Sequence, residues 1–202
     1  ADQAACPFKG YAIHRLGSKA IEEPNPGISK KLQGILIHEV LANLWANISS
    51  LENLKTKNTD ELAHMILTSI ENVFEKTENL VNCEVPIVDI EKNRIKKLVL
   101  NWLEFEKKGE NFKVVGIEKK VRGRIFNTMV SCRIDRLDRL SNGSLRVIDY
   151  KTGLFTKGDL EPPRINAPQL YLYSMLLGLN KVSGFSVAKI NVKTASLISK
   201  II

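Results

Sequence analysis

The chain has 202 residues, 44% of them hydrophobic and 26% charged, which is the composition of a globular protein and excludes a disordered or fibrous one. No apolar run approaches the ~20 residues needed to cross a bilayer and no signal peptide is recognisable, so we expect no membrane association and a cytoplasmic location. The formal net charge of +8 favours polyanionic partners, of which nucleic acid is the commonest.

Both ends of the sequence look cut. The first residue is Ala1 rather than Met and the chain stops inside an apolar-rich segment, so we expect a single domain over 1–202 that is a C-terminal fragment of a longer polypeptide. The three cysteines are too far apart for a zinc ribbon or a redox motif, and free thiols in a reducing cytosol are the simplest account. They are Cys6, Cys83 and Cys132.

The first half of the chain predicts helices. Between Lys30 and Ile48, apolar residues recur at steps of three and four, as on one face of a helix. Ser29 precedes this run as a candidate N-cap, and Pro, Asn and Gly residues predict a loop over 22–27. We predict helices over 2–16 (despite Pro7), 30–48, 59–79 and 89–108. The last of these is rich in lysine and arginine, which fits a solvated face as well as one that meets DNA.

The second half of the chain predicts mainly strands. The Asn142-Gly143 pair, inside a turn over 141–143, is a strong hairpin signal, and a second turn is expected at Arg122-Gly123. A proline-containing loop over 153–168 follows the third strand. We predict strands over 112–121, 124–140 and 144–150, a helix over 169–179 and a strand over 184–192. The core order is therefore helices, three strands, helix, strand.

The stretch Val147–Gly153 carries the most informative pattern. Alternate side chains of a strand share a face, so Asp149 and Lys151 point the same way. Asp135 lies on the preceding strand, and the Asn142-Gly143 hairpin makes these two strands neighbours. We therefore predict two carboxylates beside a fixed positive charge at one point of the sheet.

This arrangement suits hydrolysis of a phosphodiester. The reaction needs a metal ion that polarises the phosphate and generates hydroxide, and Mg²⁺ or Mn²⁺ can be held by one or two carboxylates with phosphate and water. Asp135 and Asp149 fit that role, and the Lys151 ammonium can orient the water or offset charge in the transition state. Taken alone, the Asp-x-Lys pair fits an ion pair at a strand end better than a catalytic pair.

Three residues on helices are further candidates. His38 could complete a carboxylate metal site. Gln169 and Tyr173 lie one helical turn apart, so together they could contact a phosphate and stack on a base or sugar. Packing within the fold is the alternative for each of them, and it is favoured when each is taken alone.

Four charged residues are assigned mainly structural or surface roles. Glu118, in the first strand, could support the metal site, but fixing the edge of the sheet is the favoured interpretation. Glu39 points about 100° away from His38 around the helix and is expected to face solvent. Arg136 and Asp138 are interpreted as exposed strand charges.

Taken together and in order, these motifs resemble the RecB-type branch of the PD-(D/E)xK nuclease superfamily. The resemblance runs through Gly34-x-x-x-His38-x-x-Leu41, Asp135, Asp149-Tyr150-Lys151-Thr152-Gly153 and Gln169-x-x-x-Tyr173. It implies an α/β, restriction-endonuclease-like core, a mixed sheet in helix–three strands–helix–strand order flanked by helices, with extra N-terminal helices. By residue, it implies metal binding by His38, Asp135 and Asp149, catalysis by Lys151 with the two acids, and Gln169 and Tyr173 near the DNA.

The start of the chain is more closely similar to the C-terminal nuclease domain of AddB-like DNA repair proteins, through Ala5-Cys6-Pro7-Phe8 and His14-Arg15-Leu16-Gly17. The resemblance implies metal-dependent DNA cleavage, commonly exonucleolytic, during end processing in recombination and repair. It implies as partner a helicase subunit or an upstream helicase-like region, and we expect the isolated domain to be a monomer. Many relatives hold an iron–sulfur cluster, but no cysteine follows Cys132, so no cluster is expected in this chain.

Two alternatives stay open. A non-catalytic DNA-binding or scaffolding module could retain the nuclease fold within a helicase–nuclease complex, although intact Asp135, Asp149 and Lys151 speak against it. A site-specific endonuclease of restriction type shares the acid–acid–lysine core, but His38 and the Gln169–Tyr173 pair favour the RecB-type branch.

Overall fold

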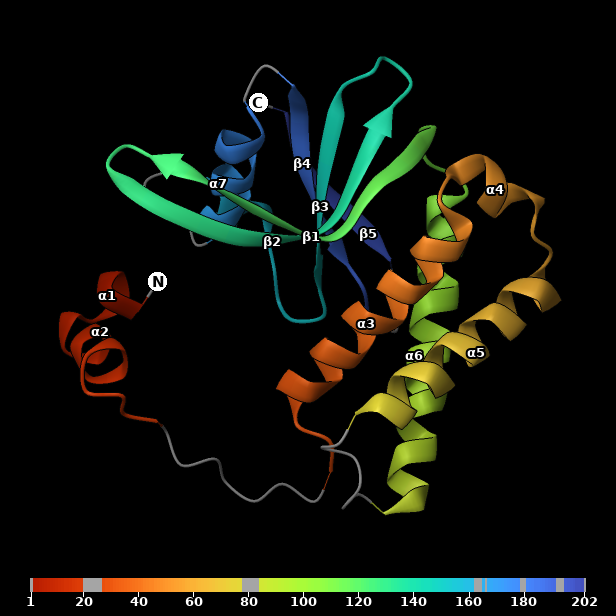
Figure 1. Cartoon of the computed structure of the whole chain (residues 1–202). Helices are drawn as coiled ribbons and strands as arrows, with labels where there is room; N and C mark the ends of the chain where they lie inside the picture. The colour runs from red at the N-terminus through yellow and green to blue at the C-terminus, as the bar shows by residue number, and fades with distance from the viewer. Residues whose placement is uncertain are drawn as a thin grey trace.

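The computed structural model describes residues 2–19, 27–77, 84–161, 165, 167–178, 181–191 and 195–201. Its centre is a five-stranded mixed sheet with helices on both faces, as Figure 1 shows, which confirms the predicted fold class. The strands lie side by side in chain order: β1 (Phe112–Ile125), β2 (Thr128–Leu140), β3 (Leu145–Lys151), β4 (Val182–Lys189) and β5 (Ser196–Ile201). β3 and β4 are parallel and the other neighbours are antiparallel.

One face of the sheet is covered by the helices of the first half of the chain. These are α3 (Lys30–Ile48), α4 (Leu51–Thr56), α5 (Thr59–Lys76) and α6 (Val85–Glu106). Their apolar faces form one core cluster with sheet residues such as Ile148 and Tyr150. Ser29 caps α3 as predicted, because its Oγ accepts a hydrogen bond from the Leu32 amide at 3.3 Å. No helix in the described part of the chain is long and apolar enough to cross a membrane.

The opposite face of the sheet is covered by α7 (Pro168–Leu177), which follows a short 3₁₀ turn, η2 (Lys157–Leu160). A second core cluster joins this helix to Ile134, Val147 and Phe185 of the sheet. Because both faces of the central strands are covered, the residues of β3 and β4 are buried nearly continuously, although both strands include polar residues.

The first predicted helix is divided into α1 (Asp2–Ala5) and α2 (Pro7–His14), which pack against each other. Cys6, between them, is extended with φ −157°, because a residue before proline is driven out of the helical region. Pro7 then begins α2, where its missing N–H costs nothing. Most of the predicted loop over 22–27, together with Cys83, lies outside the described residues.

The β2–β3 hairpin turns at Asn142-Gly143 as predicted, with Gly143 at φ +83°. The turn predicted at Arg122-Gly123 is wrong, because β1 continues to Ile125 and the chain reverses at Phe126 and Asn127. Three short elements, α4, η2 and β5, were not predicted. The other boundaries differ from the predictions by a few residues.

Candidate functional site

The candidate site forms where β2 and β3 stop pairing. Their ladder ends at Arg136 opposite Ile148. Beyond that point the Tyr150 amide donates a hydrogen bond to Asp135 Oδ2 at 2.9 Å. The Asp135 carboxylate is thus held by the backbone of β3 at Tyr150, the residue between Asp149 and Lys151.

His38 reaches the site from α3, whose buried apolar face fixes the helix against the sheet. Its Nδ1 lies 3.4 Å from Asp135 Oδ2 and its Nε2 lies 2.9 Å from the Tyr150 carbonyl oxygen. With the proton assigned to Nε2, that nitrogen donates to the carbonyl and Nδ1 offers a lone pair beside Asp135. A ring nitrogen beside a carboxylate, with the other held by a backbone carbonyl, is the arrangement typical of a metal-binding histidine.

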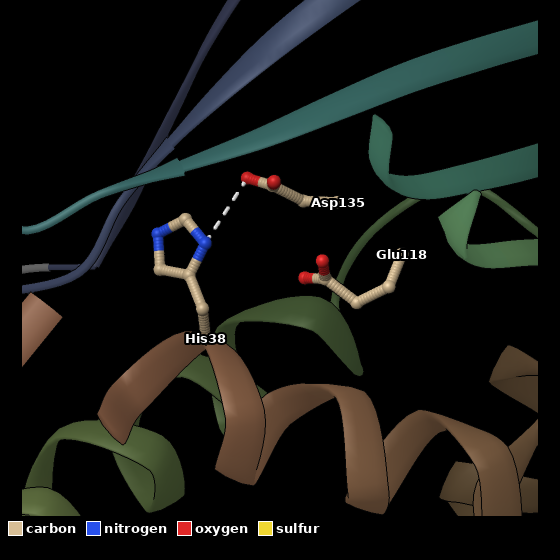
Figure 2. Close-up of side chains that lie close together, drawn as sticks. All are labelled: His38, Glu118 and Asp135. Carbon is tan, nitrogen blue, oxygen red and sulfur yellow. Dashed lines mark ion pairs between the residues drawn. The ribbon is translucent and has the colours of Figure 1, made fainter. Parts of the chain in front are cut away.

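Glu118 is the third member of the cluster. Ligand atoms of His38, Glu118 and Asp135 lie within 4.8 Å of one another, and among the described residues these form the group that could share an ion. Figure 2 shows the three side chains, from α3, β1 and β2, directed toward a common point. Glu118 has φ +46°, a conformation that costs a non-glycine residue about 1–3 kcal/mol and that is found at active sites among other places.

Asp149 and Lys151 stand beside this cluster rather than inside it. Lys151 Nζ lies 2.8 Å from Asp149 Oδ2 and neutralises it as an ion pair, but not in hydrogen-bonding geometry. Arg133 Nε lies 2.8 Å from Glu118 Oε2 in the same way. Two buried carboxylate oxygens therefore accept no hydrogen bond within the described structure, although most such atoms in proteins do.

The pKa values of the site report an excess of negative charge. Burial raises the pKa of Asp149 and of Glu118, the charge of Asp135 raises both further, and Lys151 and Arg133 oppose the shifts. Burial alone would lower the pKa of His38, but its hydrogen bond to Asp135 and the charge of that carboxylate raise it above 6.5. Burial and the charge of Asp135 thus raise the pKa values of the two carboxyl groups, and the contact with Asp135 raises that of His38.

These features fit a hard divalent cation. Such an ion takes oxygen ligands and one imidazole readily, and it supplies the charge that the carboxylates lack. His38, Glu118 and Asp135 have the geometry to hold it. Asp149 faces Lys151 and is not part of the mutually close group, although its charge acts on His38.

The two candidates on α7 differ in position. Tyr173 is only 7% exposed and belongs to the second core cluster. Its pKa is raised by burial and then by the charges of Asp149 and Asp135, so its hydroxyl lies near the site. Gln169 is half-buried one turn earlier on the same helix. The structure thus brings Tyr173 toward the acids, and no contact of Gln169 with them is seen among the described residues.

Two open grooves lie along α3. One, of about 640 Å³, runs between α3, α5 and β1 and is lined by Glu39 and Glu118. The other, of about 430 Å³, is lined by Lys30, Arg94, Thr152 and Lys189. The second groove is basic and begins directly after Lys151, so it suits an anionic ligand.

Behind the site lies a buried ionic network that the sequence interpretation missed. Arg136 and Asp138, predicted to be exposed, are both fully buried. The Arg136 guanidinium donates two hydrogen bonds to Asp138, at 2.7 and 2.8 Å, and others to Glu106 and the Tyr150 hydroxyl. Arg146 donates to Asp138 from the other side. The side chain of Tyr150 is anchored here, while its backbone holds His38 and Asp135.

Comparison with known proteins identifies a family and a structural relative. Residues 2–196 match a family model described as the PD-(D/E)XK nuclease superfamily. Among solved structures, the crystal structure of SSO0001 is similar at 17% sequence identity, with 98% of this chain and 77% of that chain covered and a TM-score of 0.34. No curated protein matches the chain.

Proposed function

The chain belongs to the PD-(D/E)XK nuclease superfamily, whose members are metal-dependent nucleases, and we propose that it cleaves DNA at the cluster formed by His38, Glu118 and Asp135 with Asp149 and Lys151. The observation that carries this proposal is the convergence of the cluster from α3, β1, β2 and β3 at the point where β2 leaves β3.

In this proposal His38, Glu118 and Asp135 hold the ion, and Asp149 completes its surroundings from β3. A bound Mg²⁺ or Mn²⁺ would polarise the scissile phosphate and make an attacking water more acidic. Glu118 is thereby assigned to the ion instead of serving the sheet edge alone.

Lys151 is the proposed catalytic cation. Its side chain is 35% exposed while Asp149 beside it is almost fully buried, so the ammonium can reach a phosphate that approaches from solvent. There it orients the attacking water and offsets the charge that develops in the transition state. The tether to Asp149 keeps the ammonium at the site before DNA arrives.

The basic groove next to Lys151 supports DNA as the substrate. Lys30, Arg94 and Lys189 line it, and they would contact the phosphates that follow the scissile one. Tyr173, on the other face of the sheet, limits access of water to Asp149, and Gln169 is proposed to contact DNA from the same helix. Two further features follow the family resemblance: exonucleolytic action in end processing for recombination and repair, and association with a helicase.

Digestion of end-labelled linear DNA and of closed circular DNA in Mn²⁺ tests the proposal. We expect degradation of the linear form, complete inhibition by excess chelator, and no degradation by Asp149→Ala or Lys151→Ala protein. Degradation of the circular form would show that the protein acts as an endonuclease and not as an exonuclease. Activity that survives chelation would contradict the metal mechanism. DNA binding by the wild-type protein without cleavage in any divalent ion would instead support a non-catalytic module.

A further inference from the structure

The β1–β2 hairpin is longer than the site requires. Figure 1 shows it projecting from the sheet with its turn directed away from α3, α5 and α6. Pairing of the two strands continues from Phe112 opposite Leu140 as far as Ile125 opposite Thr128. The segment beyond Glu118 adds about 20 Å of ribbon, at about 3.3 Å per residue.

The two faces of this ribbon differ. One face packs on α7: a side chain at Gly123 would meet Leu176, and Val121 and Cys132 contact the second core cluster. Because side chains alternate along a strand, the residues between them face the other way. That other face is exposed to solvent.

The exposed face carries a row of cations. Lys120, Arg122 and Arg124 follow one another at every second position of β1, and all three are exposed. Neighbours in this row are about 6.6 Å apart along the strand, a repeat close to the separation of adjacent phosphates in one DNA strand. Arg133 on β2, opposite Lys120, extends the row toward the site.

Arg133 joins the row to the metal cluster. Its Nε lies 2.8 Å from Glu118 Oε2, yet 66% of its side chain remains exposed. The row therefore starts at a ligand candidate and runs outward along the hairpin. Between Glu118 and the turn, the cations of this face have no acidic neighbour on the same strand, since the sequence from Lys119 to Ile125 contains none.

We propose that the solvent-facing side of the β1–β2 hairpin, through Lys120, Arg122 and Arg124, tracks the phosphate backbone of the DNA strand that leads to the metal cluster. This inference rests on the proposed function, since it assigns a path to that substrate. The three cations of β1 and their regular spacing match a phosphate chain in charge and in repeat, and contacts of this kind position DNA without reading its sequence.

Binding of a fluorescein-labelled oligothymidylate, measured by anisotropy in excess EDTA over about 50–200 mM salt, tests the inference. EDTA prevents cleavage, so binding is measured independently of the metal. In Lys120→Gln/Arg122→Gln/Arg124→Gln protein we expect the slope of log affinity against log salt to fall by about 2, since each phosphate contact on a single strand contributes about 0.7. The affinity should fall about 100-fold at 0.1 M salt by the same relation.

The matched control is Lys55→Gln/Lys97→Gln/Lys108→Gln protein. It loses the same number of positive charges, one from α4, one from α6 and one from the turn that follows α6. We expect this protein to keep the wild-type slope. A hairpin variant with the wild-type slope, a control variant that loses as much, or a wild-type protein that does not bind would overturn the inference. Circular dichroism and Mn²⁺ titration of both variants show whether the fold and the metal cluster are retained. Hairpin-dependent binding by a protein that cleaves nothing in Mn²⁺ would contradict the proposed function and support the inference.

Discussion

Consecutive residues of β2 build two polar clusters with opposite properties. Arg136 and Asp138 belong to a closed network. Arg136 is fully buried, every nitrogen of its guanidinium has a partner, and the two cations Arg136 and Arg146 balance the carboxylates of Asp138 and Glu106. Asp135, one residue earlier, belongs to an open cluster. There, carboxylates exceed cations and buried oxygens of Asp149 and Glu118 accept no hydrogen bond within the described structure.

The difference separates a structural use of charge from a functional one. In the closed network the guanidinium also lies over the rings of Trp45 and Phe112, at 4.0 and 4.4 Å from their centroids, so nothing is left to bind a ligand. The open cluster keeps unsatisfied oxygens and raised carboxylate pKa values at a strained position, Glu118. A raised pKa at a fully paired guanidinium such as that of Arg136 reflects its structural ion pairs, whereas raised pKa values of carboxyl groups whose buried oxygens accept no hydrogen bond favour a binding site.

The largest expected effect is on catalysis. Asp149→Asn keeps the shape of the side chain but removes its charge, so we expect DNA cleavage in Mn²⁺ to fall at least about 1,000-fold, or about 4 kcal/mol of barrier. The melting temperature should not fall, since burial disfavours the charge that is removed. Cleavage rates and thermal melts of the same preparations check both parts. Near wild-type cleavage would place the chemistry elsewhere.

Arg136→Met should lower the stability of the fold, in contrast to Asp149→Asn, which should lower the rate of cleavage. It leaves Glu106 and Asp138 buried without their main partner, and removal of one member of a buried ion pair costs about 3–5 kcal/mol. Urea denaturation measures this loss. Lys92→Met, which removes an ion pair to Glu71 on the surface, is the control and should cost less than about 1 kcal/mol. Equal losses in the two variants would mean that the network is not the tightly coupled structure inferred from its contacts.

Metal binding at the open cluster should stabilise the folded protein. At a Mn²⁺ concentration 100 times the dissociation constant, an ion that binds the folded state alone adds about 2.7 kcal/mol to the free energy of unfolding. We expect this gain in the wild-type protein and its loss in Asp135→Asn protein. Denaturant curves with Mn²⁺ and with chelator measure it. The same gain in both proteins would show that the ion binds outside the cluster.

The smallest expected effect is the pH dependence that His38 confers on the metal-free protein. Its folded-state pKa is raised above 6.5, so the folded state binds more protons than the unfolded state between 6.5 and that raised value. The contribution of His38 to stability is therefore complete below about pH 6.5 and is lost as the pH rises through the folded-state pKa. In chelator, the stability difference between wild-type and His38→Gln protein should shrink toward alkaline pH. A difference that grows with pH would contradict the pairing with Asp135.

Local signals explain what could be predicted from the sequence. The Asn142-Gly143 turn sets the β2–β3 hairpin by local backbone preference, and with it the neighbouring positions of Asp135 and Asp149. Apolar periodicity and the Ser29 cap predicted α3, and so the element that carries His38. The order of the elements followed from these signals, and the fold class followed from the family resemblance.

The remaining features depend on contacts that are distant in sequence. Glu118 joins the cluster because its backbone adopts a positive φ within β1. The sequence does not predict this conformation, since the residue is not a glycine. In the sequence, Arg136 and Asp138 look like surface charges. Their burial depends on a partner thirty residues away, because the Glu106 carboxylate accepts a hydrogen bond from the Arg136 guanidinium. The turn at Phe126 and Asn127 lacks glycine as well. Gly123, which predicted a turn, lies inside β1, where its missing side chain allows close packing against Leu176 of α7.

Anomalous scattering of a crystal soaked in Mn²⁺ is the most direct test of the proposed metal cluster. We expect a peak at about 2.1 Å from a carboxylate oxygen of Asp135, with His38 Nδ1 and Glu118 as further ligands and Asp149 next to the ion. A peak bound elsewhere, or none at the cluster in a crystal whose protein cleaves DNA in the same Mn²⁺ concentration, would contradict it.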